Sequence, residues 1–173
     1  MMGNRLNSDF YSRDVLVVAS ELVGKVLVRC SDNQSVERFI IVEVEAYRGT
    51  EDLACHASKG RTSRTEVMYH QGGLVYVYLI YGMYWMLNIV AGEPNSPQAV
   101  LIRGLEGCYG PGRLAKRLSI GKDFYGEDLV KSPRLWVEES NRKFEIKTAP
   151  RIGVDYAGEW ASKPWRFFVD GMV

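Results

Sequence analysis

The sequence carries almost no net charge. Its 22 Lys and Arg residues face 21 Asp and Glu residues, which leaves a formal net charge of +1 with His neutral. This balance argues against a basic nucleic-acid tail and against an acidic disordered segment, because each needs a long excess of one sign. A local basic face stays possible. Residues 103–122 hold five cations and one acid, whereas residues 43–52 hold four acids and one Arg, so charge of opposite sign is separated along the chain.

Cysteine and histidine are also scarce. Cys30, Cys55 and Cys108 form no CxxC pair, and His56 and His70 are the only two histidines. A disulfide framework and a structural zinc site are therefore unexpected, and we expect neither a metal ion nor a cofactor. The first residues lack the apolar stretch of a secretory signal. These absences indicate an intracellular, reducing compartment.

What is present is typical of one folded domain spanning residues 1–173. Hydrophobic residues make up 46% of the chain and charged residues 25%, which suits a single core at this length. Ten tyrosines are a large number, and each buried hydroxyl needs a hydrogen-bond partner.

The order of short segments predicts an α+β fold. We expect helices over Ser12–Leu22, capped by Ser12, and over Arg113–Leu118, after Pro111. Short β-branched runs predict strands over Lys25–Arg29, Arg38–Tyr47, Ala99–Arg103, Leu135–Glu138 and Arg166–Val169. Because strands and helices do not alternate regularly, we expect a single compact domain with a mainly antiparallel β-sheet core, a protruding β-hairpin and a few surrounding helices.

The uncharged run from Gln71 to Gly92 has two interpretations. Its length approaches that of a membrane span. Its β-branched and aromatic residues, its tyrosine hydroxyls and Gly82 near its middle favour a hairpin that turns at Tyr81-Gly82-Met83. We therefore predict a hairpin and no membrane association.

Acidic side chains alternate along the strand predicted over Arg38–Tyr47. Glu43 and Glu45 share one face with Tyr47, because side chains of a strand alternate with a period of two. Such a face is often solvated, but it also suits a carboxylate that lines a cleft and acts as a general base. The second interpretation is favoured because His56 and a cationic loop follow within about twenty residues. A thiol nucleophile at Cys55 has little support, because neighbouring residues rarely face each other.

Two further segments suggest contact with nucleic acid. The run Gly60–Thr65 (GRTSRT) has the arginines and small hydroxyl residues of a phosphate-contacting loop, although an ordinary solvated loop looks the same. Tyr81 and Met83 at the hairpin turn suit a wedge that enters a base stack, unless the hairpin is buried in the core.

Together these segments closely resemble the alkyladenine (3-methyladenine, or methylpurine) DNA glycosylase family. The resemblance runs in order from about Phe10 to the C-terminus. The matching segments are VEVEAYRGTEDLACH (Val42 to His56), YVYLIYGM (Tyr76 to Met83), Asn88, VLIR (Val100 to Arg103), GPGRL (Gly110 to Leu114) and PRIGVDYAGEWASKPWRFFV (Pro150 to Val169). The loop usual in the family reads Arg-Thr-Pro-Arg-Asn, where this chain has Ser63 and Thr65.

The resemblance implies a monofunctional enzyme that flips alkylated or otherwise damaged purines out of duplex DNA and hydrolyses the N-glycosidic bond with water. Carried over by position, Glu45 resembles the general base that activates this water. Arg103 and the main-chain carbonyl of Ile152 resemble its further holders. 3-Methyladenine and 7-methylguanine are the implied substrates, while hypoxanthine and etheno-adenine stay open.

The same resemblance implies roles around the flipped base. Tyr47, His56 and Tyr78 resemble the walls that sandwich it, and Asn88 resembles the gate that disfavours normal guanine. Tyr81 resembles the side chain that fills the gap left in the duplex.

We expect further DNA contacts from Arg61, Arg64, Met68, Met83 and Tyr84. The expected partner is double-stranded DNA with damaged purines, bound by a monomer located in the cytoplasm with the nucleoid, or in the nucleus of a eukaryote. The alternative is a lesion-binding or structured-nucleic-acid-binding protein without turnover, for which a carboxylate such as Glu45 is not needed.

Overall fold

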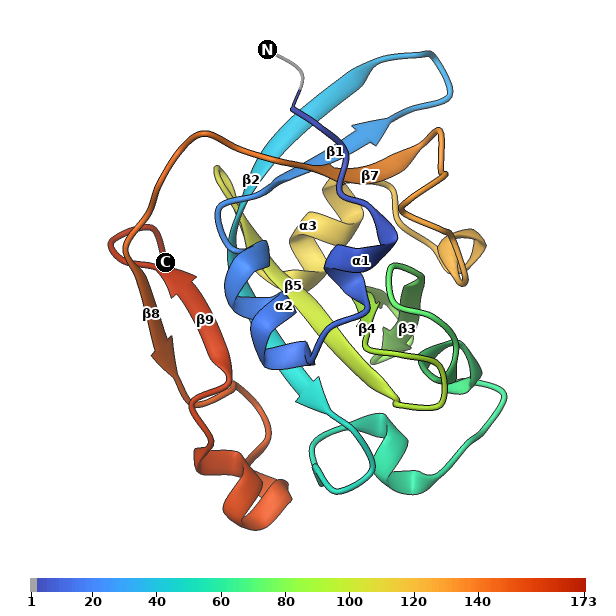
Figure 1. Cartoon of the computed structure of the whole chain (residues 1–173), viewed down its shortest axis with the longest axis vertical. Helices are drawn as coiled ribbons and strands as arrows, with labels where there is room; N and C mark the ends of the chain where they lie inside the picture. The colour runs from blue at the N-terminus through green and yellow to red at the C-terminus, as the bar shows by residue number, and fades with distance from the viewer. Residues whose placement is uncertain (1–2) are drawn as a thin grey trace.

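The computed structural model describes residues 3–173 as one antiparallel sheet with a few short helices (Figure 1). The strands are Val26–Cys30 (β1), Val36–Arg48 (β2), Val75–Ile80 (β3), Tyr84–Ala91 (β4), Gln98–Leu105 (β5), Cys108–Tyr109 (β6), Leu135–Glu138 (β7), Ile146–Ala149 (β8) and Arg166–Val169 (β9). The α-helices are Ser8–Tyr11 (α1), Val15–Leu22 (α2) and Pro111–Arg117 (α3). The 3₁₀ segments are His56–Lys59 (η1), Glu66–Tyr69 (η2), Lys122–Phe124 (η3) and Asp155–Ser162 (η4), the last of which is kinked at Gly158.

The sheet is organised around the long strand β2. Its strand order is β3-β4-β5-β2-β1-β7, with β6 attached to β5, and β9 bridging β2 and β8. β2 pairs with β1 through its first residues, and with β5 and β9 through its later residues. The expected α+β class with an antiparallel core is confirmed, and β7 and β9 have the expected bounds. The short strands β6 and β8 were not predicted from the sequence.

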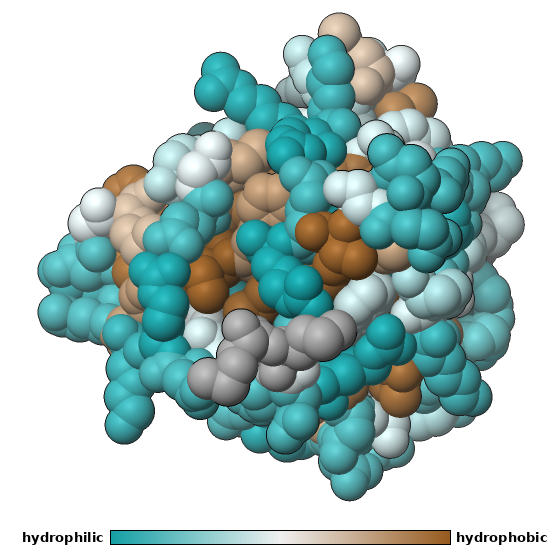
Figure 2. Space-filling model, turned by 90° about the horizontal axis from the view of Figure 1, so that it is seen from above, coloured by the Kyte–Doolittle hydropathy of each residue, from teal (hydrophilic) through white to brown (hydrophobic). Residues whose placement is uncertain are grey.

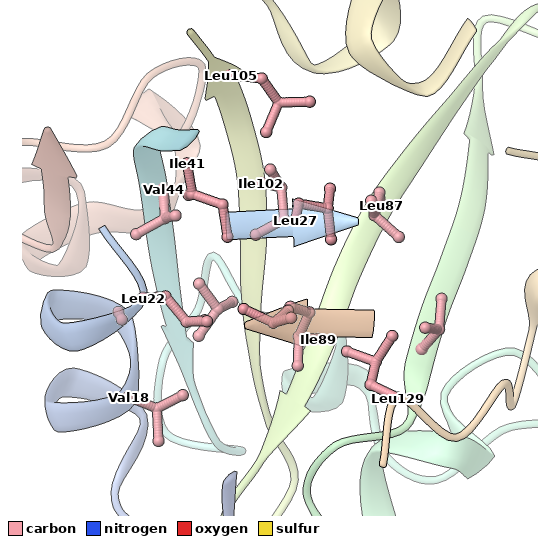
Figure 3. Packing of buried hydrophobic residues seen from close by; sticks show 14 of the residues in the cluster. Val18, Leu22, Leu27, Ile41, Val44, Leu87, Ile89, Ile102, Leu105 and Leu129 are labelled. Carbon is pink, nitrogen blue, oxygen red and sulfur yellow. The ribbon is translucent and has the colours of Figure 1, made fainter. Parts of the chain in front are cut away.

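Period-two alternation divides the sheet into a core face and a second face. Val44 and Ala46 of β2 belong to the main hydrophobic cluster, whereas Glu45 and Tyr47 point the other way. Figure 3 shows Val18 and Leu22 of α2 packed against the sheet side chains of the core face. Full burial of each such aliphatic side chain contributes about 1.5 to 3 kcal/mol. The second face carries the polar and aromatic residues of interest.

The helix predicted over Ser12–Leu22 begins later than expected, and the short helix α1 before it was not predicted. Val15 opens α2, and the Asp14 carboxylate caps it by accepting the Leu16 N–H at 2.9 Å. Ser12 instead ends α1, where its hydroxyl donates to the Ser8 carbonyl at 2.8 Å. Asp14 competes successfully for the capping position because the chain turns between the two helices.

The uncharged run forms the predicted hairpin of β3 and β4, with Ile80 paired to Tyr84. The tip is a tight turn in which the Met83 N–H donates to the Ile80 carbonyl at 3.0 Å. Tyr81 and Gly82 both have positive φ, of 51° and 64°, as in the type I′ turns of hairpins. Within residues 3–173, no helix is long and apolar enough to cross a membrane.

The outer surface is mixed in charge rather than basic throughout. Figure 2 shows one face covered mainly by hydrophilic side chains, with smaller apolar areas between them. Many of the exposed charges are paired, as Arg13 is with Glu21 and Arg142 is with Glu106. Charges of opposite sign, which are separated along the sequence, therefore meet in pairs on the surface.

Candidate active site

Glu45 is a fully buried carboxylate at the centre of the sheet. Its backbone lies between β5 and β9, paired to Leu101 and Arg166. Its Oε2 accepts the Tyr47 hydroxyl at 2.7 Å, and its Oε1 accepts the Ile152 main-chain N–H at 2.7 Å. The carboxylate is therefore held at both oxygens by groups from two different segments.

The surroundings of Glu45 make it a stronger base than an exposed carboxylate. Burial raises the pKa of Glu45, and the nearby Glu43 charge raises it further, while Arg103 and the hydrogen bonds from Ile152 and Tyr47 oppose the shift. A raised pKa keeps a carboxylate able to accept a proton near neutral pH. This perturbation, together with the defined hydrogen bonds, marks Glu45 as the candidate catalytic group.

An aromatic pocket opens beside Tyr47, and we use this term for the following residues throughout. It is lined by Tyr47, Ala54, Cys55, His56, Met68, Tyr76, Tyr78, Asn88 and Ala99. His56 and Tyr78 meet edge to face, with ring centroids 4.5 Å apart. Space for the centre of a water molecule is only about 20 Å³, close to the 10–15 Å³ that one such centre occupies. The pocket is therefore a narrow slot between aromatic side chains.

His56 is neutral in the aromatic pocket. Burial, aided by the Arg64 charge, lowers the pKa of His56 to about 4. Its Nδ1 lies 2.8 Å from the Tyr76 hydroxyl, so the ring is fixed in orientation. Burial also raises the pKa of the Cys55 thiol to about 12, which leaves no thiolate and removes the support for a cysteine nucleophile.

Asn88 and Met68 form deeper parts of the aromatic pocket. The Asn88 amide nitrogen donates to the main-chain carbonyls of Tyr76 and Met86 at 3.2 and 3.3 Å. These two acceptors fix the amide, so its oxygen is the atom free to meet a ligand. Met68, expected at the DNA surface, is 1% exposed and is a wall of the pocket.

Arg151 and Asp52 form a buried ion pair next to this site. Nothing in the local sequence predicted this pair. Arg151 binds Asp52 through two contacts of 2.6 and 2.9 Å, and neither side chain is exposed. Arg151 also donates to the main-chain carbonyls of Ala46 and Trp160, and its guanidinium lies 4.9 Å from the centre of the Tyr47 ring. Because Arg151 precedes Ile152, the ion pair anchors the main chain that donates to Glu45.

A second carboxylate, Glu43, lies on the same side of β2. Its Oε1 accepts from Arg103 at 3.4 Å and from Arg166 at 3.1 Å. The Arg103 Nε is also 3.6 Å from Glu45 Oε1. The predicted face of Glu43, Glu45 and Tyr47 therefore exists, with the two carboxylates buried and paired and Tyr47 half-buried.

The Gly60–Thr65 loop is tied down by hydroxyl groups. Thr62 and Thr65 exchange main-chain and side-chain hydrogen bonds, and the Tyr125 hydroxyl donates to the carbonyls of Ser63 and Arg64. These contacts hold the loop in place without a proline at position 63. The Arg64 guanidinium lies 5.0 Å from the Tyr78 ring centre, at the aromatic pocket.

Arg61 is occupied by an intramolecular partner. Its guanidinium binds both oxygens of Glu66, at 2.8 and 2.6 Å, and lies over the Tyr69 ring. This contact, with a further one from His70, lowers the pKa of Glu66 to about 2. A phosphate group that approaches Arg61 therefore competes with Glu66.

The hairpin tip is the most exposed apolar feature near the site. Tyr81 is 88% exposed and Met83 is 64% exposed, while Tyr84 is partly covered by Gly112 of α3. Two cations of residues 103–122 have different surroundings. Lys116 lies in the groove beside Tyr84, whereas Arg117 pairs with Glu37 of β2.

The structure brings Glu45, Tyr47, Arg103 and Ile152 together and places Tyr47 also in the wall of the aromatic pocket. Ile152 meets Glu45 through its N–H, and the role that the resemblance implies for its carbonyl, as a holder of water, stays a prediction. Tyr76 and Arg151 were not predicted. Tyr76 could have been found from its alternation with Tyr78, but nothing in the local sequence pairs Arg151 with a residue 99 positions away.

Comparison with known proteins identifies the family of the chain. The family described as methylpurine-DNA glycosylase (MPG) matches residues 9–109 and 106–173. A protein of Desulfitobacterium hafniense strain Y51 is 43% identical, over 96% of this chain and 95% of its own length. Proteins of Methanocella arvoryzae and of Legionella pneumophila strain Corby are each 46% identical, over 94% and 95% of this chain and 91% and 94% of their own lengths. All three are named "Putative 3-methyladenine DNA glycosylase". The chain belongs to the methylpurine-DNA glycosylase family.

Proposed function

We propose that this enzyme is a DNA glycosylase that removes alkylated purines from duplex DNA, with Glu45 as the base that activates water. The observation that carries the proposal is the buried Glu45 carboxylate, which is held at both oxygens beside a narrow aromatic pocket. A binding protein would gain nothing from this carboxylate, since its burial costs free energy. The relatives named as 3-methyladenine DNA glycosylases favour 3-methyladenine as one substrate.

The chemistry follows from the two sides of Glu45. Oε2 faces Tyr47 of the aromatic pocket, and Oε1 faces Ile152 and Arg103. With the purine in the pocket, a water held on the Oε1 side would attack the sugar carbon from the face opposite the base. The C1′–N bond breaks, the purine leaves with the bonding electron pair, and the water oxygen bonds to C1′ as Glu45 accepts its proton. The carboxylate also stabilises the positive charge that develops on the sugar.

Recognition of the base would come from its positive charge and its fit. Purines alkylated at N3 or N7 are cationic, and they bind electron-rich aromatic faces such as Tyr47 and Tyr78 by about 0.5 to 2 kcal/mol. The neutral state of His56 avoids repulsion of this charge. Asn88, fixed by two carbonyl groups, would crowd the exocyclic amine of guanine. A weakened glycosidic bond and easier flipping add to the selectivity.

Extrusion of the base would depend on the hairpin. Tyr81 at the tip would enter the gap left in the duplex, with Met83 and Tyr84 beside it. Arg61 and Arg64 would contact phosphates, and Met68 would touch the extruded base from inside the pocket.

Because water is the nucleophile, no covalent intermediate with the protein forms and no strand cleavage follows. The monomer suffices, since one chain supplies every group named.

The proposal is tested with Glu45→Gln on methylated duplex DNA. Base release is followed under single-turnover conditions by chromatographic identification of free 3-methyladenine. We expect release to fall by about 10²- to 10⁴-fold, the range for loss of a general base. Binding to a duplex with a tetrahydrofuran abasic analogue should persist. Release at the wild-type rate would exclude Glu45 as the base, and absence of release by the wild-type chain would support the non-catalytic alternative.

A further inference from the structure

The contacts of Glu43 set it apart from the other carboxylates of the site. It is nearly buried, and one of its oxygens accepts from both Arg103 and Arg166. Arg103 is shared between two carboxylates, because its Nε lies 3.4 Å from Glu43 Oε1 and 3.6 Å from Glu45 Oε1. Glu43 therefore competes with Glu45 for the same cation.

The strands are irregular at this point. The register of β2 and β5 shifts on both sides of Glu43, which pairs with Gly104, so that Val42 and Arg103 have no partner of their own in the ladder. Bulges of this kind redirect side chains and are common beside active sites. Here the irregularity brings Arg103 to the face that carries the two glutamates.

Gly104 gives Glu43 the room it occupies. A Cβ at position 104 would lie 3.2 Å from Glu43 Cβ and 3.5 Å from its Oε2. Gly104 does not have a positive φ, unlike twelve other glycines, so its backbone conformation does not require glycine. The space required by Glu43 is thus a reason for glycine at this position.

The way Arg103 is held matters for the chemistry. It meets the carboxylates through Nε, and within residues 3–173 its two Nη groups make no hydrogen bond. Arg103 lines an open cavity of about 580 Å³, together with Glu43, Ile152 and Arg166. An unrestrained guanidinium prefers to bind a carboxylate through two parallel hydrogen bonds. Such a pair with Glu45 would occupy the oxygen that the proposed water needs.

We propose that Glu43 is a positioning residue that holds Arg103 away from a two-point ion pair with Glu45. The Glu45 carboxylate thereby stays basic, and the Arg103 amino groups stay available to water or to the DNA backbone. Arg166, which donates to the Pro150 carbonyl at 3.1 Å, donates to the same Glu43 oxygen as Arg103 and ties Glu43 to the segment that leads to Ile152. This role rests on the proposed function of Glu45.

The test is Glu43→Gln, which keeps the shape of the side chain and removes its charge. We expect the single-turnover rate of 3-methyladenine release to fall by about ten- to a hundredfold, as for loss of a hydrogen bond to a charged group. Arg103 would then approach Glu45, and the Glu43 charge that raises the Glu45 pKa would be gone. Both changes lower that pKa, so the acid limb of the pH–rate profile should move to lower pH. Binding to the abasic-analogue duplex should stay within about twofold.

A double-mutant cycle separates positioning from general damage. In an Arg103→Gln background, Glu43→Gln should cause no further loss of rate. Gly104→Ala, which crowds Glu43 without changing charge, should move the acid limb in the same direction. Glu138→Gln is the matched control, because Glu138 is a buried carboxylate that binds Arg38 at the β7 edge, and it should leave the pH profile unchanged.

The outcomes distinguish this inference from the proposed function. If Glu45→Gln abolishes release but Glu43→Gln has the wild-type rate and acid limb, the positioning role is wrong while the function of Glu45 stands. Equal losses from Glu43→Gln with and without Arg103 would also overturn the role. If Glu45→Gln itself keeps the wild-type rate, both proposals fail together.

Discussion

The Glu45 region and the hairpin tip are built in opposite ways. Glu45 is buried and held by hydrogen bonds from two segments, and the Arg151–Asp52 pair fixes the chain behind it. Tyr81 is almost fully exposed and adopts a left-handed conformation that costs an ordinary residue about 1–2 kcal/mol. The side chains proposed for the chemistry are therefore held in place by the protein itself. The side chain proposed to open the duplex is exposed to solvent in the free protein.

The largest effect should come from breaking the support of the fixed region. Asp52→Asn leaves the Arg151 charge buried without its counter-ion, so the free energy of unfolding should fall by about 3–5 kcal/mol. Urea denaturation followed by circular dichroism measures it. Asp170→Asn, which breaks the exposed pair with Lys147, serves as the control and should change nothing measurable. Equal stability of Asp52→Asn and wild type would mean that the pair does not anchor the site.

A smaller effect, on the rate of base release, should follow from removing a hydrogen bond to Glu45. Tyr47→Phe removes a hydrogen bond that lowers the Glu45 pKa, so this pKa should rise further. Because the base must be ionised, the acid limb of base release should move to higher pH, with a rate loss of about tenfold below it. Tyr11→Phe is the control, since the buried Tyr11 hydroxyl makes no hydrogen bond within residues 3–173. A limb at the wild-type pH in Tyr47→Phe would contradict the coupling.

The exposed region should respond in the opposite sense, with a gain of stability and a loss of function. Tyr81→Asn creates an Asn-Gly turn, the favoured sequence for this conformation, and should raise the free energy of unfolding by about 0.5–1 kcal/mol. Base release from duplex DNA at low enzyme concentration should nevertheless fall severalfold, while release of a base already unpaired changes less. Gln34 also has a left-handed backbone, with φ of 66°, and it is far from Tyr81 along the chain. The control variant Gln34→Asn should therefore gain stability without loss of base release. Unchanged release by Tyr81→Asn would argue against the wedge.

The smallest effect concerns the DNA-facing loop. Glu66→Gln removes the carboxylate that occupies Arg61, so affinity for duplex DNA should rise by a few-fold and depend more steeply on salt. Glu21→Gln changes the net charge equally but lies on α2, which packs on the core face of the sheet, and it should have less effect. Fluorescence anisotropy at several salt concentrations compares the two. A larger gain from Glu21→Gln would mean that Arg61 is not at the DNA interface.

Much of the fold could be predicted because its signals are local. Alternation along residues 38–47 and 74–90 identified the strands and their two faces, and the turn at Tyr81-Gly82 was located by its glycine. The start of α2 was predicted wrongly because Ser12 and Asp14 are both good capping residues, and only the path of the chain selects one. The two-residue strand β6 was missed because so short a run has no recognisable pattern.

The sequence by itself determined which side chains share a face and, through ordered motifs, the family. The tertiary structure alone decided that Glu43 is paired and buried, that Ile152 meets Glu45 through its N–H, and that Arg151 supports the site. It also decided that Arg117 of the basic stretch 103–122 pairs with Glu37 of β2. The physical reason for this difference is the distance along the chain between the residues that interact. Alternation is a property of neighbouring residues, whereas a partner some hundred positions away depends on which strands pair and in which register.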